Sequence, residues 1–232
     1  MLRERLKKIY FFRKTLWDIA VKELKAKYAG SILGISWAVI NPLLIMSAVT
    51  FIFTSIFKIE MKGFFLFVLS GIFPWFFFCN TLSDVTNSFL NKKSILHQFN
   101  LPREIIPLGS ILSNFLNFLI GWLVIYPLFL FFNPKIVLLS PLLLIALLLS
   151  LLFISGLGLI FSVANIFYRD IGQLLGVLLM FWFWITPVFY SVDMVPVKFR
   201  WIYDFNPVTP FIIYYREILF AGRIPEPSAF IA

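Results

Sequence analysis

The stretch IVLLSPLLLIALLLSLLFISGLGLIFSVANIFY, residues 136 to 168, decides the fold. It carries no charge and exceeds the roughly 20 apolar helical residues that cross a hydrocarbon core about 30 Å thick. Four further uncharged stretches reach that length, at residues 32 to 57, 64 to 83, 105 to 134 and 171 to 192. The sequence therefore predicts an all-α integral membrane protein, a polytopic bundle with five complete transmembrane helices.

Composition supports this prediction and excludes several kinds of site. The chain is 61% hydrophobic and 13% charged, a balance that one soluble core does not accommodate. Cys79 is the single cysteine and lies inside a predicted span, so the chain cannot form a disulfide framework. His97 is the single histidine and lies in a polar loop, where a solvated side chain is favoured over a metal ligand. No metal site is expected.

The basic residues predict the orientation of the chain. Nine Lys and Arg residues precede the first span, and thirteen of the 20 fall on that side of the predicted membrane. The positive-inside rule then places the N-terminus in the cytoplasm. The basic residues lie beside the spans, where anionic lipid headgroups account for the net charge of +9. No nucleic acid partner is therefore expected. No secretory signal peptide is predicted, because an apolar h-region with a small-residue cleavage site is missing.

Segments outside the spans predict surface helices. Apolar residues recur at helical spacing over residues 1 to 28, which predicts a cytoplasmic amphipathic helix at the membrane interface. The transmembrane domain is assigned to residues 29 to 232. Its external region, residues 191 to 227, is predicted to form short interfacial or re-entrant helices, chiefly over residues 211 to 221. A sixth span is expected to begin at about residue 228.

The contents of the spans favour transport over catalysis. No span holds an ionisable group, although ion-coupled secondary transporters bury such groups. A membrane glycosyltransferase would need paired acids or a metal-binding carboxylate cluster, and no such pair is evident. An ion-coupled secondary transporter and a membrane glycosyltransferase remain open as alternatives. The chain also lacks a Gly-rich loop ending in Gly-Lys-Ser/Thr that could bind ATP phosphates, so if transport is active its energy must come from another subunit.

Aromatic and hydroxyl side chains share one face of the second predicted span. Phe73, Phe77, Thr81 and Asp84 fall within a narrow arc at 100° per residue. This pattern fits either a substrate passage or helix packing, and the two readings are evenly balanced. The predicted path residues, drawn from several spans, are Phe73, Phe77, Thr81, Trp184, Trp37 and Tyr190. A similar polar stripe in the third span, including Asn114, is interpreted as packing.

Five groups of residues stand out along the chain. In order they are YAGSILGISW (28–37) with NPL (41–43), FNLPRE (99–104) with PL (107–108), FYRDI (167–171), TPVFY (186–190) and NPVTP (206–210). Together, from about residue 15 to 220, they resemble the membrane subunits of ABC-2-type exporters, in their polysaccharide branch. The likeness is strongest to the membrane subunits of O-antigen exporters. Two departures are Thr186, where the family often has Ser, and the missing sixth span.

The resemblance implies a six-span subunit that forms a homodimer in the bacterial inner membrane with two copies of a separate ATPase. ATP and Mg would bind to that ATPase, and this chain would bind no cofactor and catalyse no reaction. The implied substrate is a lipid-linked polysaccharide that leaves the cytoplasm. Exporters of teichoic acid, lipid or drugs remain alternatives within the superfamily.

Two cytoplasmic segments are predicted to contact the ATPase, because a partner at the membrane surface can touch both of them. The predicted coupling residues are Ser94, His97, Phe99, Arg103, Glu104, Arg169 and Asp170. Arg169 and Asp170 could instead serve as an interfacial anchor and a helix cap. Apolar residues interrupt the polar ones at nearly helical intervals from Phe89 to Phe99. This spacing is compatible with a short partner-facing helix in the predicted loop.

Overall fold

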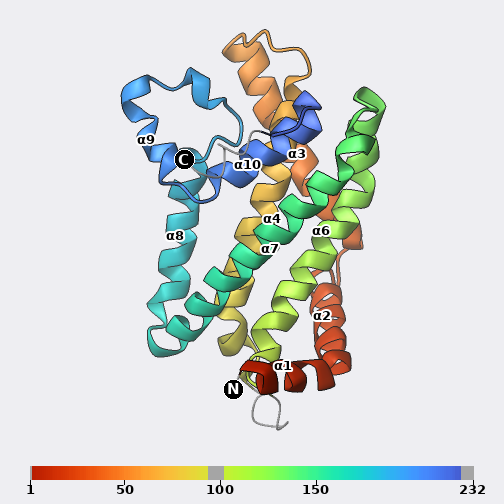
Figure 1. Cartoon of the computed structure of the whole chain (residues 1–232), viewed down its shortest axis with the longest axis vertical. Coiled ribbons are helices and arrows are strands. Elements are labelled where there is room, and N and C mark those ends of the chain that lie inside the picture. Colours follow the sequence, from red (N-terminus) through yellow and green to blue (C-terminus); the bar gives the residue numbers. More distant parts are fainter. Residues whose placement is uncertain (1, 94–101, 226–232) are drawn as a thin grey trace. The chain divides into compact units, whose positions relative to one another are not determined.

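The computed structural model describes residues 2–93 and 102–225, and those residues form helices joined by turns, without a strand (Figure 1). Within them, four helical segments are long and apolar enough to cross a bilayer. These are Gly34–Ile56, α4 (Phe64–Asn91), α6 (Ile105–Phe132) and α7 (Ile136–Phe167). The first comprises η1 (Gly34–Ser36), α3 (Trp37–Phe51) and η2 (Ile52–Ile56). The helical membrane fold predicted from the sequence is confirmed.

The chain divides into two compact units, and each boundary between them falls inside a helix. Unit 1 contains Met1–Ile35, Phe77–Leu119 and Leu151–Val177. Unit 2 contains Ser36–Phe76, Ile120–Ser150 and Leu178–Ala232. Unit 1 therefore holds the predicted cytoplasmic helix and coupling segments, and unit 2 holds the predicted external region.

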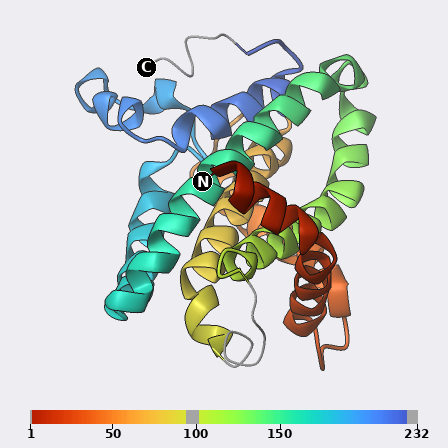
Figure 2. The ribbon, with the colours of Figure 1, turned by 60° about the horizontal axis from the view of Figure 1, so that its bottom comes forward.

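The N-terminal segment of unit 1 forms two helices, whereas the sequence predicted one over residues 1 to 28. Helix α1 (Leu2–Phe11) ends before Phe12, and α2 (Arg13–Lys27) follows it. Phe12 has φ −88° and ψ 14°, outside α-helical geometry, and its ring packs edge-on against Phe11 at 5.3 Å between centroids. Figure 2 shows the change of direction between the two helices.

The predicted fifth span, residues 171 to 192, is shorter in the structure. Helix α8 (Asp170–Ile185) has 16 residues, which at about 1.5 Å per residue span about 24 Å. Pro187 has no N–H to continue the helix. Asn206 also holds the end of α8, because Trp182 Nε1 donates to its Oδ1 at 2.7 Å and its Nδ2 donates to Thr186 Oγ1 at 2.9 Å. These side-chain bonds favour a turn at this point over further helix.

The predicted helix over residues 211 to 221 is confirmed, with an earlier start. Helix α10 (Thr209–Arg216) continues directly as η5 (Glu217–Ala221). Gly222 ends it with φ 64°, a left-handed conformation that glycine adopts at little cost. Shorter elements of the same external region are η3 (Val192–Met194), η4 (Val197–Phe199) and α9 (Trp201–Asp204). The predicted start of a sixth span lies outside the described residues.

Candidate functional site: polar triads between α2, α4 and α6

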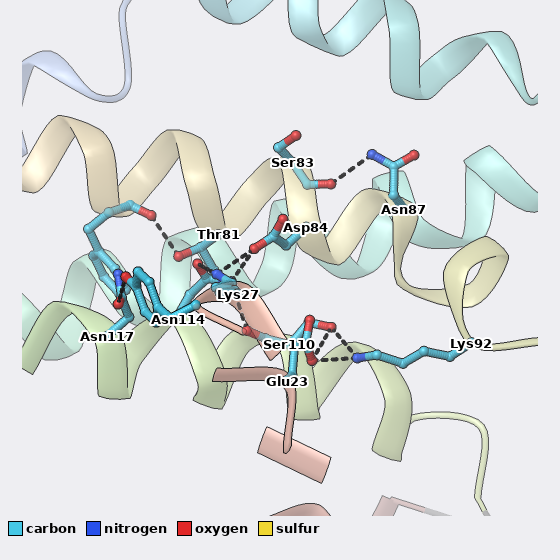
Figure 3. Close-up of polar contacts among 12 residues, drawn as sticks. Glu23, Lys27, Thr81, Ser83, Asp84, Asn87, Lys92, Ser110, Asn114 and Asn117 are labelled. Atoms are coloured by element: carbon cyan, nitrogen blue, oxygen red, sulfur yellow. Dashed lines mark hydrogen bonds and ion pairs between the residues drawn. The ribbon is translucent and has the colours of Figure 1, made fainter. Parts of the chain in front are cut away.

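Three helices of unit 1 meet through a charged triad. Lys27 of α2 places its Nζ 2.7 Å from Asp84 Oδ2 of α4 and 2.7 Å from Asn114 Oδ1 of α6. The Asn114 amide closes the triangle by donating to Asp84 Oδ2 at 2.9 Å (Figure 3). A carboxylate at the end of an apolar span is therefore neutralised by a cation from the amphipathic segment.

A second triad joins α2 and α6 to the residue that follows α4. Lys92, directly after Asn91, pairs with Glu23 of α2 and donates to Ser110 Oγ of α6 at 2.9 Å. The Ser110 hydroxyl lies 3.1 Å from Glu23 Oε2. The charged side chains are only 15% and 17% exposed, so water screens this pair less than a surface pair.

The two triads use opposite charges on α2. Lys27 supplies the cation in one triad, and Glu23, one turn earlier, supplies the anion in the other. If α2 slipped by one turn, Glu23 would approach Asp84 and the two carboxylates would repel each other. The triads therefore specify the register of α2 against the ends of α4 and α6.

A third polar contact follows on the same side of unit 1. The Tyr28 hydroxyl donates to Asn117 Oδ1 of α6. Burial raises the pKa of this hydroxyl above its ordinary value, so the phenol remains protonated and able to donate. The polar stripe of α6 thus binds α2 and the residue after it, which agrees with the packing role predicted for that stripe.

A cavity of about 880 Å³ opens beside the triads. Its lining includes Phe12 between α1 and α2, Thr15 and Ile19 from the N-terminal half of α2, and Ser88 and Asn91 from α4. The triad residues Glu23, Lys27, Asp84 and Lys92 also line it, so both halves of α2 border this cavity. Groups of three or more His, Cys, Asp or Glu side chains able to hold a metal ion are not found among residues 2–93 and 102–225.

Three predicted path residues are buried inside the chain. Phe73, 4% exposed, stacks on Trp122 of α6 at 5.7 Å between centroids. Phe77, 5% exposed, packs against Phe118 at 4.6 Å. The Thr81 hydroxyl donates to the Phe77 carbonyl oxygen at 2.6 Å. In this conformation the face of α4 chosen from the sequence contributes to the packing of the chain itself.

The other predicted path residues are more accessible. Trp184 is 60% exposed at the end of α8. Tyr190 is half-buried, and its hydroxyl donates to the Trp184 carbonyl oxygen at 2.8 Å and lies 3.0 Å from the Tyr203 hydroxyl. Trp37 is half-buried at the start of α3. Trp184 and Tyr190 are thus brought together, and their role in a path stays a prediction.

The described coupling residues lie at the ends of helices in unit 1. Arg103 is exposed and Glu104 half-buried just before α6, whereas Arg169 and Asp170 are exposed where α7 gives way to α8. The remaining predicted coupling residues, Ser94, His97 and Phe99, lie outside the described residues.

Sequence reasoning missed Glu23, Lys27 and Lys92 as members of a defined site. Glu23 and Lys27 are spaced i, i+4 on α2, as are Ser110 and Asn114 on α6. Residues with this spacing share a helix face. The matched spacing is the sequence signal for the contact, although it does not reveal which two helices meet.

Comparison with known proteins identifies the family. The model of the ABC-2 type transporter family matches residues 15–220. An O-antigen export system permease protein RfbA of Klebsiella pneumoniae is 33% identical over 89% of this chain and 82% of its own length. The protein of the same name from Myxococcus xanthus is 25% identical over 98% of this chain and 88% of its own length. This chain belongs to the ABC-2 type transporter family of membrane proteins.

Proposed function

We propose that this chain is the membrane subunit of an exporter that moves a lipid-linked, O-antigen-like polysaccharide out of the cytoplasm. The observation that carries the substrate assignment is the 33% identity, over nearly the whole chain, to a protein named as an O-antigen export permease. The apolar helices and the absence of ionisable groups from the predicted spans support transport by a membrane subunit.

Energy for export is assigned to a separate ATPase present in two copies, with ATP and Mg bound there. This chain contains no phosphate-binding Gly-Lys-Ser/Thr loop. The exposed Arg103 and Arg169 lie in the segments proposed to contact the ATPase. The proposed orientation in the inner membrane places the N-terminus and both segments in the cytoplasm.

The polysaccharide path is proposed to form between two copies of this chain. Helix α3 is hardly covered by the rest of the chain, and α8 exposes a row of apolar side chains that includes Met180, Phe181 and Trp184. Such faces can meet lipid or a second copy. Sugars present C–H faces to aromatic rings and hydroxyls to hydrogen-bonding groups, so exposed Trp184 and neighbouring Tyr190 suit repeated weak contacts.

The test is export in a strain whose own O-antigen permease gene is deleted, supplied with this chain and the ATPase from the same source organism. Restored surface polysaccharide, together with loss of the intracellular lipid-linked polymer, supports the proposal. A matched strain receives the same chain with an ATPase variant that binds but does not hydrolyse ATP, and it should accumulate polymer inside. Export that persists with this ATPase variant contradicts the proposed energy source.

Failure to export O-antigen by a chain that reaches the membrane and stimulates its ATPase would contradict the substrate assignment. The same purified complex, placed in vesicles with teichoic acid precursors, phospholipid or drugs, then identifies which substrate raises ATP hydrolysis. This second assay separates a wrong substrate from a wrong mechanism.

A further inference from the structure

Asn165 near the end of α7 joins three segments of unit 1. Its side chain is fully buried. Its Nδ2 donates to the Thr86 carbonyl oxygen of α4 at 3.0 Å and to Asn87 Oδ1 at 3.2 Å. Its Oδ1 accepts from the backbone N–H of Gly172 in α8 at 2.9 Å. One amide therefore links the end of α7, the middle of the C-terminal half of α4 and the first turn of α8.

The bond to Gly172 serves as a helix cap. Helix α8 begins at Asp170, so the N–H of Gly172 belongs to the first turn and has no acceptor within the helix. A residue just before a helix commonly supplies this acceptor. Here the acceptor comes from the preceding helix, which fixes the turn at Tyr168 and Arg169 between α7 and α8.

The bonds to α4 hold this capped turn against a neighbouring helix. Asn87 is itself oriented, since its Nδ2 donates to the Ser83 carbonyl oxygen at 2.9 Å (Figure 3). Gly172 allows the close approach: a Cβ at that position would lie 2.7 Å from Asn87 Oδ1. An alanine there would therefore displace the Asn87 side chain or the turn.

These bonds, here called the clamp, join the α7–α8 turn, which the proposed function assigns to ATPase contact, to α4, the helix that precedes the other such segment in the chain. The Arg169 turn is fixed to α4 at Thr86 and Asn87, and α4 ends at Asn91, just before Lys92. Lys92 in turn pairs with Glu23 of α2. The Asn165 amide thus connects the turn to the C-terminal part of α4.

We propose that Asn165 is a positioning residue that makes the α7–α8 turn and the end of α4 move as one body when the ATPase acts. This inference rests on the proposed function and adds to it a specific residue for coupling. Two contacts can be removed separately. The Asn165 Oδ1 atom caps Gly172, and the Nδ2 atom makes the clamp to Thr86 and Asn87.

The experiment compares variants in the assembled complex with its ATPase in vesicles, and it measures polymer exported per ATP hydrolysed. Asn165→Leu, which removes both contacts, should lower this ratio at least fivefold while ATPase association is retained. Asn165→Asp keeps an acceptor for Gly172 but loses the donors to Thr86 and Asn87, so it should also uncouple. Ser162→Ala is the control, since buried Ser162, one turn earlier, donates only to the Leu159 carbonyl of its own helix.

A rescue distinguishes positioning from a loss of folding. Asn87→Cys and Gly172→Cys are added to the Asn165→Leu variant, with Cys79→Ser to remove the native thiol. Linking the two cysteines with a short thiol cross-linker should restore the ratio, and the unlinked protein should stay uncoupled. The linked and unlinked proteins carry the same substitutions, so comparing their ratios tests the clamp even if Asn165→Leu alone gives a low yield.

A normal ratio in Asn165→Leu or Asn165→Asp would overturn the proposed clamp, as would a linked protein that remains uncoupled. The wild-type complex is measured in parallel. If wild-type protein neither exports polymer nor stimulates the ATPase, the proposed function fails. If wild-type protein does both and the Asn165 variants match it, only the present inference fails.

Discussion

Arg216 Nη2 donates to the Val188 carbonyl oxygen at 2.7 Å, joining α10 to the turn that follows α8. The same nitrogen donates to the Pro187 carbonyl oxygen at 2.8 Å, and the guanidinium lies 3.8 Å from the centroid of the Phe67 ring. Burial lowers the pKa of Arg216 to about 9, so the group stays charged at neutral pH. A buried cation therefore satisfies carbonyl groups left without helical partners beyond the end of α8.

We expect Arg216→Leu to destabilise the protein by about 3 kcal/mol or more, because buried carbonyl groups lose their donors. Thermal unfolding of the purified protein measures this loss. Arg223→Leu is the matched control, since Arg223 is largely exposed and pairs with Glu217, and an exposed ion pair contributes about 1 kcal/mol or less. Equal losses in the two variants would contradict the role given to Arg216.

The Lys27–Asp84 pair should respond to charge exchange. Lys27→Asp places two carboxylates beside Asn114, so α2 should detach and become sensitive to protease. The double variant Lys27→Asp, Asp84→Lys should recover part of the protection, because the pair is restored with its polarity reversed. Lys25→Asp, at an exposed position of the same helix, provides the control. A double variant as sensitive as Lys27→Asp would show that the pair does not hold α2.

Two glycines of α7 should differ in their tolerance of a side chain. A Cβ at Gly158 would lie 2.9 Å from Val85 Cγ1 of α4, whereas a Cβ at Gly156 would meet nothing within 4 Å. We expect Gly158→Leu to cost about 1–3 kcal/mol through overpacking and Gly156→Leu to cost little. Unfolding of both variants tests this difference, and Val85→Ala should partly rescue Gly158→Leu.

Cysteine labelling tests the orientation of the chain. In a Cys79→Ser background, a cysteine at exposed Lys93 should be protected from an impermeant thiol reagent in intact cells. A cysteine at Val197, a residue that is 77% exposed and lies in the predicted external region, should react. Opening the cells should make Lys93→Cys reactive. The reverse pattern in intact cells would invert the proposed topology.

Aromatic substitutions separate the path from packing. Trp184→Ala should slow export without a matching loss of folded protein, because one aromatic contact is worth about 1 kcal/mol. Phe77→Ala should mainly lower stability, since Phe77 packs on Phe118 and truncation of a buried Phe costs about 3–5 kcal/mol. Export per folded molecule and thermal unfolding are measured together. Unchanged export in Trp184→Ala would remove Trp184 from the path.

The helices of the bundle could be predicted from the sequence because membrane length and apolar composition determine them. Residues 105 to 134 were predicted and Ile105–Phe132 is observed, an agreement that needs no tertiary information. The end of α8 could not be found this way. Asn206 holds its last turn and Arg216 holds the turn that follows, and both residues are distant in sequence and invisible to a local measure of hydropathy.

The candidate site was predictable only in part, for a related reason. Helical projection grouped Phe77, Thr81 and Asp84 on one face of α4, and that grouping is geometrically sound. Projection does not reveal which helix covers the face, and here Phe118 and Lys27 from two different helices do so. A polar and aromatic stripe can line a passage or bind a neighbouring helix, and only the arrangement of helices distinguishes them.

The unequal lengths of α7 and α8 have a consequence for the surrounding lipid. Helix α7 has 32 residues and reaches about 48 Å, whereas the 16 residues of α8 reach about 24 Å, against a hydrocarbon core of about 30 Å. A long apolar helix is accommodated by tilting, and a short one by thinning the bilayer. We therefore expect a membrane dimple beside α8, where a polar lipid headgroup would have less hydrocarbon to cross.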